Sequence, residues 1–227
     1  KERAWSCIGK IIKKKSLMIP VKICGITSIN DAVLASDFGA SAIGMIFYKE
    51  SPRNIDPKDV KNWIRQVPNT VKKVGVFVNE ELGKVNTIAE FLGLDYIQLH
   101  GMESPGYCID IIKPVIKVFH LQDEISFNKL KDYKVSMFLF DSFNKGKIGG
   151  TGVPFDWNLL SNIKTNCPII LSGGLNTENI LDGVYETSPS AVDINSSIES
   201  SPGLKDYDKM ALLFDKLERT GNYVNPF

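Results

Sequence analysis

Short apolar runs alternate with segments of helical periodicity along most of the chain. From residue 21 onward, each continuous apolar run is followed by a stretch in which apolar residues recur three and four positions apart. The expected strands are Val21–Ile26, Ala42–Tyr48, Lys73–Val78, Tyr96–Leu99, Val115–His120, Met137–Phe140, Ile169–Leu171 and Val192–Ile194. The expected helices are Asp31–Phe38, Pro57–Gln66, Leu82–Leu92, Tyr107–Ile112, Phe127–Tyr133, Trp157–Ile163, Glu178–Tyr185 and Tyr207–Leu217. The pattern therefore predicts eight strand–helix pairs.

This alternation limits the fold to the α/β class. Strands that are apolar throughout are covered on both faces, and a helix between successive strands makes those strands parallel. Eight such units within about 200 residues fit a (β/α)₈ TIM barrel forming a single domain. An open doubly wound sheet is the rival, but it usually carries a glycine-rich fingerprint after its first strand. Here the loop after the first strand contains a single glycine, Gly25, so we expect the barrel.

The two ends of the chain differ from the barrel segment, which we expect to span 19–219. Residues 1–17 carry six of the 27 Lys and Arg residues and one of the 26 Asp and Glu residues. The basic stretch has no apolar core of a signal peptide, so we interpret 1–18 as an extension outside the fold. A transit peptide is the alternative. Residues 220–227 are expected to be a short C-terminal tail.

Composition narrows the classes of function. The barrel segment is mildly acidic, which argues against a nucleic-acid partner, and no run of about 18 apolar residues predicts a membrane span. The four cysteines form no CxxC pair and no spacing with histidine that is typical of a metal site. We therefore expect no metal, no disulfide framework and a cytoplasmic location.

Polar residues at the carboxyl ends of barrel strands are the candidates for catalysis. Cys24 ends the first strand, and Lys22 lies on the same face because side chains two residues apart share a face. A neighbouring ammonium would lower the pKa of the Cys24 thiol. Asp141 follows the apolar run of the sixth strand, where it either faces a substrate or forms a turn. From the residues alone, an inert buried thiol and a turn-forming aspartate stay open.

The loops after the seventh and eighth strands favour a phosphorylated ligand. Gly173 and Gly174 follow one strand, and Asn195, Ser196 and Ser197 follow the other. These are the loops that frequently bind phosphate in barrels, where glycine permits close approach of the backbone.

Two further side chains are candidates for the barrel mouth. Arg53, in the loop after the second strand, could pair with a carboxylate, although most such arginines are solvated. His100 ends the fourth strand, where a structural histidine is the more frequent case. The glycine-rich loop 145–152 is either a plain connection or a lid.

Taken together, these stretches resemble the phosphoribosylanthranilate isomerase family of tryptophan biosynthesis. The resemblance covers residues 20–218, and its motifs are specific in combination although each is weak alone. They are VKICGIT at 21–27, SPR at 51–53, VGVFVN at 74–79, IQLHG at 97–101, LFDS at 139–142, GGTG at 149–152 followed by FDW, ILSGGL at 170–175, DINSSIE at 193–199 and PGLKD at 202–206.

The resemblance implies an Amadori rearrangement of N-(5-phosphoribosyl)anthranilate to 1-(2-carboxyphenylamino)-1-deoxyribulose 5-phosphate. It implies that Cys24 is the general base and Asp141 the general acid, with no metal and no cofactor. It further implies that Arg53 holds the anthranilate carboxylate and that His100 lines the pocket. The implied phosphate ligands are Gly173, Gly174, Asn195, Ser196 and Ser197.

One motif departs from the family, since Ser197 stands where the family usually has glycine. A serine tolerates a positive φ poorly, so the resemblance leaves phosphate binding at this loop in question. Two rivals remain: the histidine-pathway isomerase, which uses two aspartates where this chain offers Cys24, and a non-catalytic barrel that binds a phosphorylated ligand. The sequence leaves a monomer and a homodimer equally open.

Overall fold

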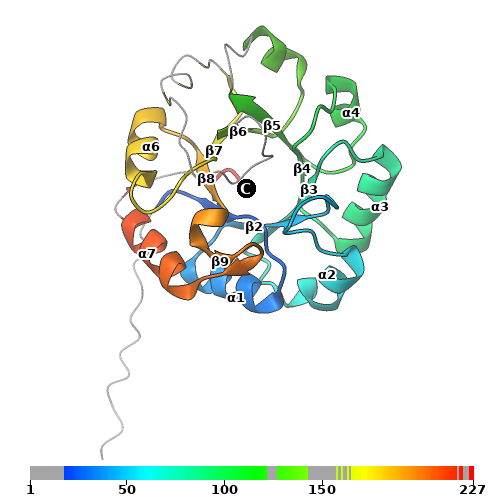
Figure 1. Cartoon of the computed structure of the whole chain (residues 1–227). Coiled ribbons are helices and arrows are strands. Elements are labelled where there is room, and N and C mark those ends of the chain that lie inside the picture. The colour runs from blue at the N-terminus through cyan, green and yellow to red at the C-terminus, as the bar shows by residue number, and fades with distance from the viewer. Residues whose placement is uncertain are drawn as a thin grey trace, which may run out of the picture.

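Eight parallel strands close into a barrel that is surrounded by helices (Figure 1). The computed structural model describes residues 18–121, 127–142, 157, 160, 163, 165–218, 220–221 and 225–227. The barrel strands are β1 (Val21–Ile23), β2 (Ala42–Ile46), β3 (Lys72–Phe77), β4 (Tyr96–Leu99), β5 (Val115–Leu121), β6 (Met137–Ser142), β7 (Ile169–Leu171) and β8 (Ala191–Ile194). The predicted (β/α)₈ barrel is confirmed.

The helices lie outside the strands, as the crossovers require. They are α1 (Ile29–Phe38), α2 (Pro57–Trp63), α3 (Leu82–Leu92), α4 (Pro105–Ile109), α6 (Ile180–Thr187) and α7 (Tyr207–Leu217). Short 3₁₀ helices occupy Ile64–Gln66, Phe127–Asp132 and Ser196–Ile198. A small antiparallel hairpin, β9 (Glu199–Ser201) with β10 (Leu204–Lys205), follows β8.

Local sequence explains where the helices begin and end. The Ser28 side chain accepts a hydrogen bond from the amide of Asp31 and caps α1, which ends at Gly39 with a φ of 97°. Asp206 caps α7 in the same way by accepting from the amide of Lys209. These signals explain why the predicted bounds of α7 are those observed.

Most expected elements differ from the structure by a few residues at their ends, and some differ more. The first strand ends at Ile23. The amide of Cys24 still donates a hydrogen bond to the carbonyl of Ile194, and the chain then turns at Gly25, whose φ is 74°. The expected helix Phe127–Tyr133 is a 3₁₀ helix over Phe127–Asp132. Most of the expected helix Trp157–Ile163 lies outside the described residues.

Register closes the barrel and sets which side chains share its interior. β1 pairs with β2 on one side and with β8 on the other, where Lys22 lies opposite Asp193. At the amino-terminal ends of the strands the interior is apolar. There, Ala42, Val74, Ile116, Val118, Met137, Leu139, Ile170 and Ala191 form a buried cluster.

The C-terminal residue packs against this cluster. The ring of Phe227 meets that of Tyr96 edge to face, with centroids 6.0 Å apart. In Figure 1 the C-terminus accordingly lies at the centre of the ring of strands. The end of the expected tail 220–227 thus covers the floor of the barrel.

Two points concern the ends and surface of the described chain. The amide of Ile19 donates a hydrogen bond to Oγ1 of Thr220 at 3.0 Å, so the segment before β1 lies beside the end of α7. Among the described residues, no helix has the length and apolar character that a membrane crossing needs. The basic extension 1–17 lies outside the described residues.

Candidate active site

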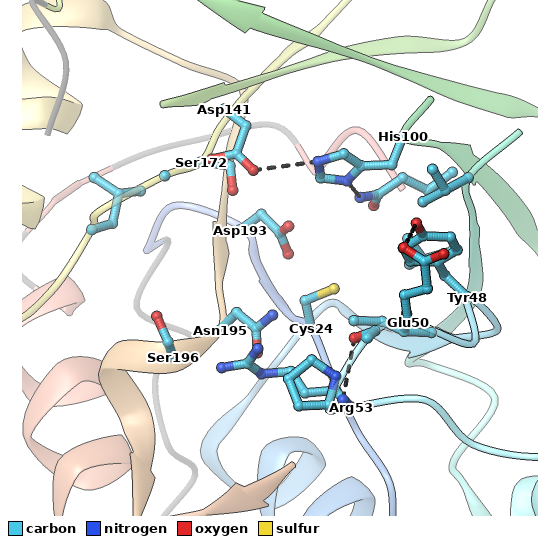
Figure 2. A pocket seen from close by; sticks show the side chains of 18 of the residues that line it. Cys24, Tyr48, Glu50, Arg53, His100, Asp141, Ser172, Asp193, Asn195 and Ser196 are labelled. Carbon is cyan, nitrogen blue, oxygen red and sulfur yellow. Dashed lines mark hydrogen bonds and ion pairs between the residues drawn. The ribbon is translucent and has the colours of Figure 1, made fainter. Parts of the chain in front are cut away.

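A cavity of about 450 Å³ opens at the carboxyl ends of the strands (Figure 2). This is the size of an ordinary small-molecule site and the end of the barrel where catalysis is expected. Its side chains come from strand ends and loops all around the barrel. The polar members are Cys24, Tyr48, Glu50, Ser51, Arg53, Gln98, His100, Asp141, Ser172, Asp193, Asn195 and Ser196.

Cys24 lies in the middle of this site, directly after β1. One interior layer below it, Nζ of Lys22 pairs with Oδ1 of Asp193 at 2.8 Å, and both side chains are buried. Gly44 of β2 makes room for this arrangement. A Cβ at Gly44 would lie 3.0 Å from both the Cys24 sulfur and the Lys22 nitrogen.

Burial controls the acidity of the thiol. Burial raises the pKa of Cys24, and the nearby Lys22 ammonium offsets this only in part because it is also paired with Asp193. The expectation that Lys22 would lower the pKa of Cys24 below its ordinary value was therefore wrong in its net direction. The free site holds Cys24 mainly as the thiol.

Asp141 lies near the carboxyl end of β6, above Cys24 in the view of Figure 2. Its Oδ2 lies 3.5 Å from Nε2 of His100, and Nδ1 of His100 lies 3.4 Å from Nε2 of Gln98. The other carboxylate oxygen, Oδ1, is buried without a hydrogen-bond partner among the described residues. Asp141 thus presents a polar atom to the cavity.

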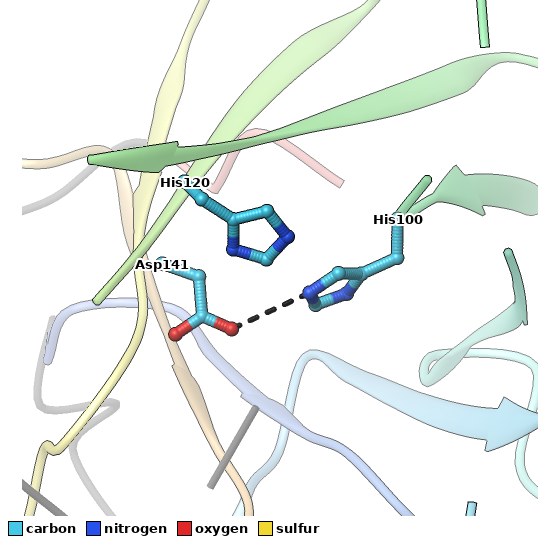
Figure 3. A group of neighbouring side chains, drawn as sticks. All are labelled: His100, His120 and Asp141. Carbon is cyan, nitrogen blue, oxygen red and sulfur yellow. Dashed lines mark ion pairs between the residues drawn. The ribbon is translucent and has the colours of Figure 1, made fainter. Parts of the chain in front are cut away.

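His120 completes a cluster with His100 and Asp141 (Figure 3). It lies opposite Asp141 in the β5–β6 register, and its ring centroid is 5.0 Å from that of His100. Burial and the neighbouring His100 lower the pKa of His120, while Asp141 raises it, and the net direction is downward. His120 is therefore mainly neutral at neutral pH.

This cluster also tests the expectation that the chain has no metal site. Its three ligand atoms lie within 4.8 Å of one another, whereas two ligands at the usual 2.0–2.2 Å of a zinc ion lie about 3.4 Å apart in a tetrahedral site. Oδ2 of Asp141 and Nε2 of His100 are 3.5 Å apart and already have this spacing, so the expectation of no metal site stays a prediction. Three strands contribute the residues, which is why linear spacing gave no sign of the cluster.

Arg53 is held by a carboxylate of the protein. Its Nε lies 2.9 and 3.0 Å from the two carboxylate oxygens of Glu199, and its Nη2 lies 2.6 Å from Oε2. This bidentate pair leaves Nη1 outside it. The side chain of Arg53 is 13% exposed and lines the cavity.

The loops after β7 and β8 form the remaining side of the cavity. Gly173 and Gly174 have φ values of 85° and 64°, a region that L side chains rarely adopt. Nδ2 of Asn179 donates to the carbonyl of Gly174 and fixes the loop. Asn195 and Ser196 face the same cavity from the other loop.

Ser197 differs from the other expected phosphate ligands. Its side chain is not part of the cavity lining, and its hydroxyl is buried without a hydrogen-bond partner among the described residues. It lies within the 3₁₀ helix Ser196–Ile198 and is not one of the described non-glycine residues with positive φ. The serine at this family glycine position therefore imposes no backbone strain.

Sequence reasoning gave no role to Glu199, Lys205 or His120. Glu199 and Lys205 stand within quoted motifs and received no interpretation there, and the structure buries both. His120 was visible only as a polar strand end. The glycine-rich loop 145–152, for which a plain connection and a lid were both left open, lies outside the described residues.

Comparison with known proteins agrees with this site. The family model described as N-(5'phosphoribosyl)anthranilate (PRA) isomerase matches residues 21–216. The N-(5'-phosphoribosyl)anthranilate isomerase of Citrifermentans bemidjiense is 43% identical over 202 residues, which are 89% of this chain and 98% of the relative. That of Geobacter sp. strain M21 is 44% identical over 193 residues, covering 85% of this chain and 95% of the relative.

Solved structures give the same result. The phosphoribosyl anthranilate isomerase of Thermus thermophilus superimposes with a TM-score of 0.81 at 33% identity, covering 88% of this chain and 98% of that one. A phosphoribosyl anthranilate isomerase in complex with reduced 1-(o-carboxyphenylamino)-1-deoxyribulose 5-phosphate superimposes at 0.76, with 34% identity and coverage of 88% and 99%. The chain belongs to the N-(5'-phosphoribosyl)anthranilate isomerase family.

Proposed function

We propose that this chain isomerises N-(5'-phosphoribosyl)anthranilate in tryptophan biosynthesis, with Cys24 and Asp141 as its base and acid. Family membership supports the reaction. The observation that carries the residue roles is that one cavity is lined by a thiol, a carboxylate, Arg53 and the Gly173–Gly174 loop. This set of groups matches a substrate that carries an anthranilate carboxylate and a phosphate.

The first step opens the sugar ring. Asp141 donates a proton to the ring oxygen, and the bond between that oxygen and C1′ breaks. The lone pair of the anthranilate nitrogen forms a double bond to C1′, which gives an iminium ion. His100 lies beside Asp141 and keeps the carboxyl group oriented toward the cavity.

The second step moves the double bond. Cys24, as the thiolate, removes the proton from C2′, and the electrons of that bond form C1′=C2′ while the nitrogen becomes neutral. The resulting enolamine takes a proton at C1′ and releases the proton of its C2′ hydroxyl, which becomes the ketone. Lys22, paired with Asp193 below the thiol, stabilises the thiolate during this step.

The two charged groups of the substrate bind to different residues of the cavity. Arg53 holds the anthranilate carboxylate through Nη1, the nitrogen outside its pair with Glu199. The backbone of Gly173 and Gly174, with Asn195, Ser196 and the amide of Ser197, holds the phosphate. We propose no metal and no cofactor for this chemistry, since Asp141 and Cys24 supply the acid and the base of the rearrangement.

The test is an assay of the purified chain with N-(5'-phosphoribosyl)anthranilate, after dialysis against EDTA. Cys24→Ala and Asp141→Ala should each lower kcat by about 10²–10⁴-fold, the usual worth of a general acid or base. Arg53→Ala should mainly raise KM. Cys108→Ala, which removes another buried thiol outside the cavity, should retain full activity.

Other outcomes separate the rivals. Full activity in Cys24→Ala would show that the base is a different group. A folded wild-type chain that fails to rescue a tryptophan auxotroph would favour a non-catalytic barrel that binds a phosphorylated ligand. Turnover of the histidine-pathway substrate at a similar rate would favour a bifunctional isomerase.

Location and assembly stay predictions. A cytoplasmic enzyme is the expectation for this biosynthetic role. Dimeric and monomeric forms both occur for a relative, the dimeric isomerase of Thermotoga maritima and its generated monomers. For this chain, size-exclusion chromatography with light scattering would decide between a homodimer and a monomer.

A further inference from the structure

A buried carboxylate outside the catalytic pair connects Arg53 with the loop after β8, and the two lie beside each other at Gly25. Glu199 lies at the start of β9, and its carboxylate accepts hydrogen bonds from Nε and Nη2 of Arg53. It also accepts from Nζ of Lys205 at 2.9 Å and from the amide of Gly203 at 3.2 Å. The side chain of Glu199 is 4% exposed. Burial alone would raise the pKa of Glu199, but the bonds from Arg53 and Lys205 outweigh it and hold the pKa below its ordinary value.

Lys205 extends this connection to the phosphate side. Its Nζ donates to the side-chain oxygen of Asn195 at 3.1 Å and lies 3.3 Å from the carbonyl of Asn195. Its side chain is fully buried. A continuous chain of bonds thus runs from Arg53 through Glu199 and Lys205 to Asn195.

The packing leaves these groups little freedom to move apart. A Cβ at Gly25 would lie 2.6 Å from Oδ1 of Asn195 and 2.8 Å from Cδ of Arg53, so both side chains close around the same glycine. The hairpin turn at Gly203 accepts a hydrogen bond from the Thr27 hydroxyl. The loops after β1, β2 and β8 therefore meet around Gly25 and the β9–β10 hairpin.

We propose that Glu199 and Lys205 are positioning residues that couple recognition of the substrate carboxylate to recognition of its phosphate. Glu199 fixes the Arg53 guanidinium so that Nη1 faces the cavity, and Lys205 fixes Asn195 in the loop that receives the phosphate. Because Arg53 and Asn195 are held by the same carboxylate–lysine pair, a change that displaces one of these side chains also displaces the other. This inference rests on the proposed role of Arg53, and the experiment separates the two.

The experiment measures inhibition constants for two small probes, anthranilate and inorganic phosphate, together with KM and kcat. Arg53→Lys should weaken anthranilate, and Lys205→Met should weaken phosphate. Glu199→Gln, which keeps the shape and removes the charge, should weaken both by about tenfold, the equivalent of one charge-assisted hydrogen bond. KM should rise by more than kcat falls.

A matched control distinguishes positioning from general destabilisation. Glu103→Gln breaks another buried carboxylate–lysine pair, with Lys117 at 2.7 Å, which touches neither Arg53 nor Asn195. This variant should lower the melting temperature and leave both inhibition constants unchanged. If it moved both constants as Glu199→Gln does, the effect would be unspecific and the proposal would fail.

The remaining outcomes are equally decisive. Weakened anthranilate with unchanged phosphate in Glu199→Gln would overturn the coupling and leave Glu199 as a support for Arg53 alone. An unchanged anthranilate constant in Arg53→Lys would overturn the proposed role of Arg53 and not the network itself. Should Glu199→Gln fail to fold, Lys205→Met alone tests the phosphate side, and an unchanged phosphate constant there would refute the proposal.

Discussion

At the scale of the residue, Cys24 shows that proximity of a cation does not settle the state of a thiol. Lys22 lies close to it, yet Lys22 is committed to Asp193, and burial keeps the pKa of Cys24 above its ordinary value. The resting enzyme therefore stores the base in its protonated form. We expect Cys24 to become the thiolate during the catalytic cycle or when the pH is raised.

This state predicts a pH dependence. The value of kcat/KM for the free enzyme should increase as pH rises from about 7 toward and beyond about 8.5, the ordinary pKa of a thiol, because the thiolate fraction increases over that range. The measurement is a pH profile of kcat/KM with circular dichroism to verify that the fold persists. A profile that is flat across this range would contradict the assignment of Cys24 as the base.

Alkylation gives an independent reading of the same pKa. Iodoacetamide should modify Cys24 more slowly than the half-buried Cys167, and the rate at Cys24 should increase with pH. The reduced product analogue should protect Cys24 and leave Cys167 unaffected. Mass spectrometry of the modified peptides distinguishes the two thiols.

At the scale of the element, sequence patterns predicted what depends on local order. Apolar runs located the barrel strands, and position after a run placed Cys24 and Asp141 at the barrel mouth before the structure did. Hairpin β9–β10 escaped prediction because its strands of three and two residues carry no apolar pattern. Glu199 and Lys205 escaped for a related reason, since only contacts between distant loops bury them.

Gly44 of β2 has no side chain and so leaves room for Cys24 and Lys22. Gly44→Ala would place a Cβ 3.0 Å from both the Cys24 sulfur and the Lys22 nitrogen, so one of them has to shift. We expect kcat to fall by about tenfold or more, since small displacements of reacting groups are costly. The measurement is steady-state kinetics of the variant.

Gly106→Ala provides the comparison for Gly44→Ala. A Cβ at Gly106 in α4 would approach Ser104 only to 3.8 Å, an ordinary contact far from the thiol. This variant should retain wild-type kcat. If Gly44→Ala also retained it, the interior around Lys22 would be more adaptable than its packing indicates.

At the scale of the whole molecule, the two ends of the barrel differ in composition and in role. The mouth carries the polar site, and the floor carries the apolar cluster covered by Phe227. Phe227→Ala should therefore lower stability without changing kcat or KM. Phe227 is half-buried, so the loss should be about 1 kcal/mol, or roughly 2–4 °C in Tm for a chain of this size.

Thermal unfolding followed by circular dichroism checks this effect. Tyr185→Ala, which removes an aromatic side chain that is 59% exposed, is the control and should leave Tm nearly unchanged. Equal Tm values for Phe227→Ala and the wild type would show that the floor of the barrel is stable without its cover. A change in kcat would show that floor and mouth are not independent.

The hydrogen bond between Ile19 and Thr220 has a consequence for how the chain could be rewired. Because Ile19 precedes β1, Thr220 follows α7 and the two are in contact, a short linker could join residues 18 and 221 in place of residues 222–227. New termini could then be opened in any loop on the floor side. A circular permutant of this kind would keep every strand pairing of the ring and every loop of the mouth, so connectivity could be varied while the chemistry stays constant.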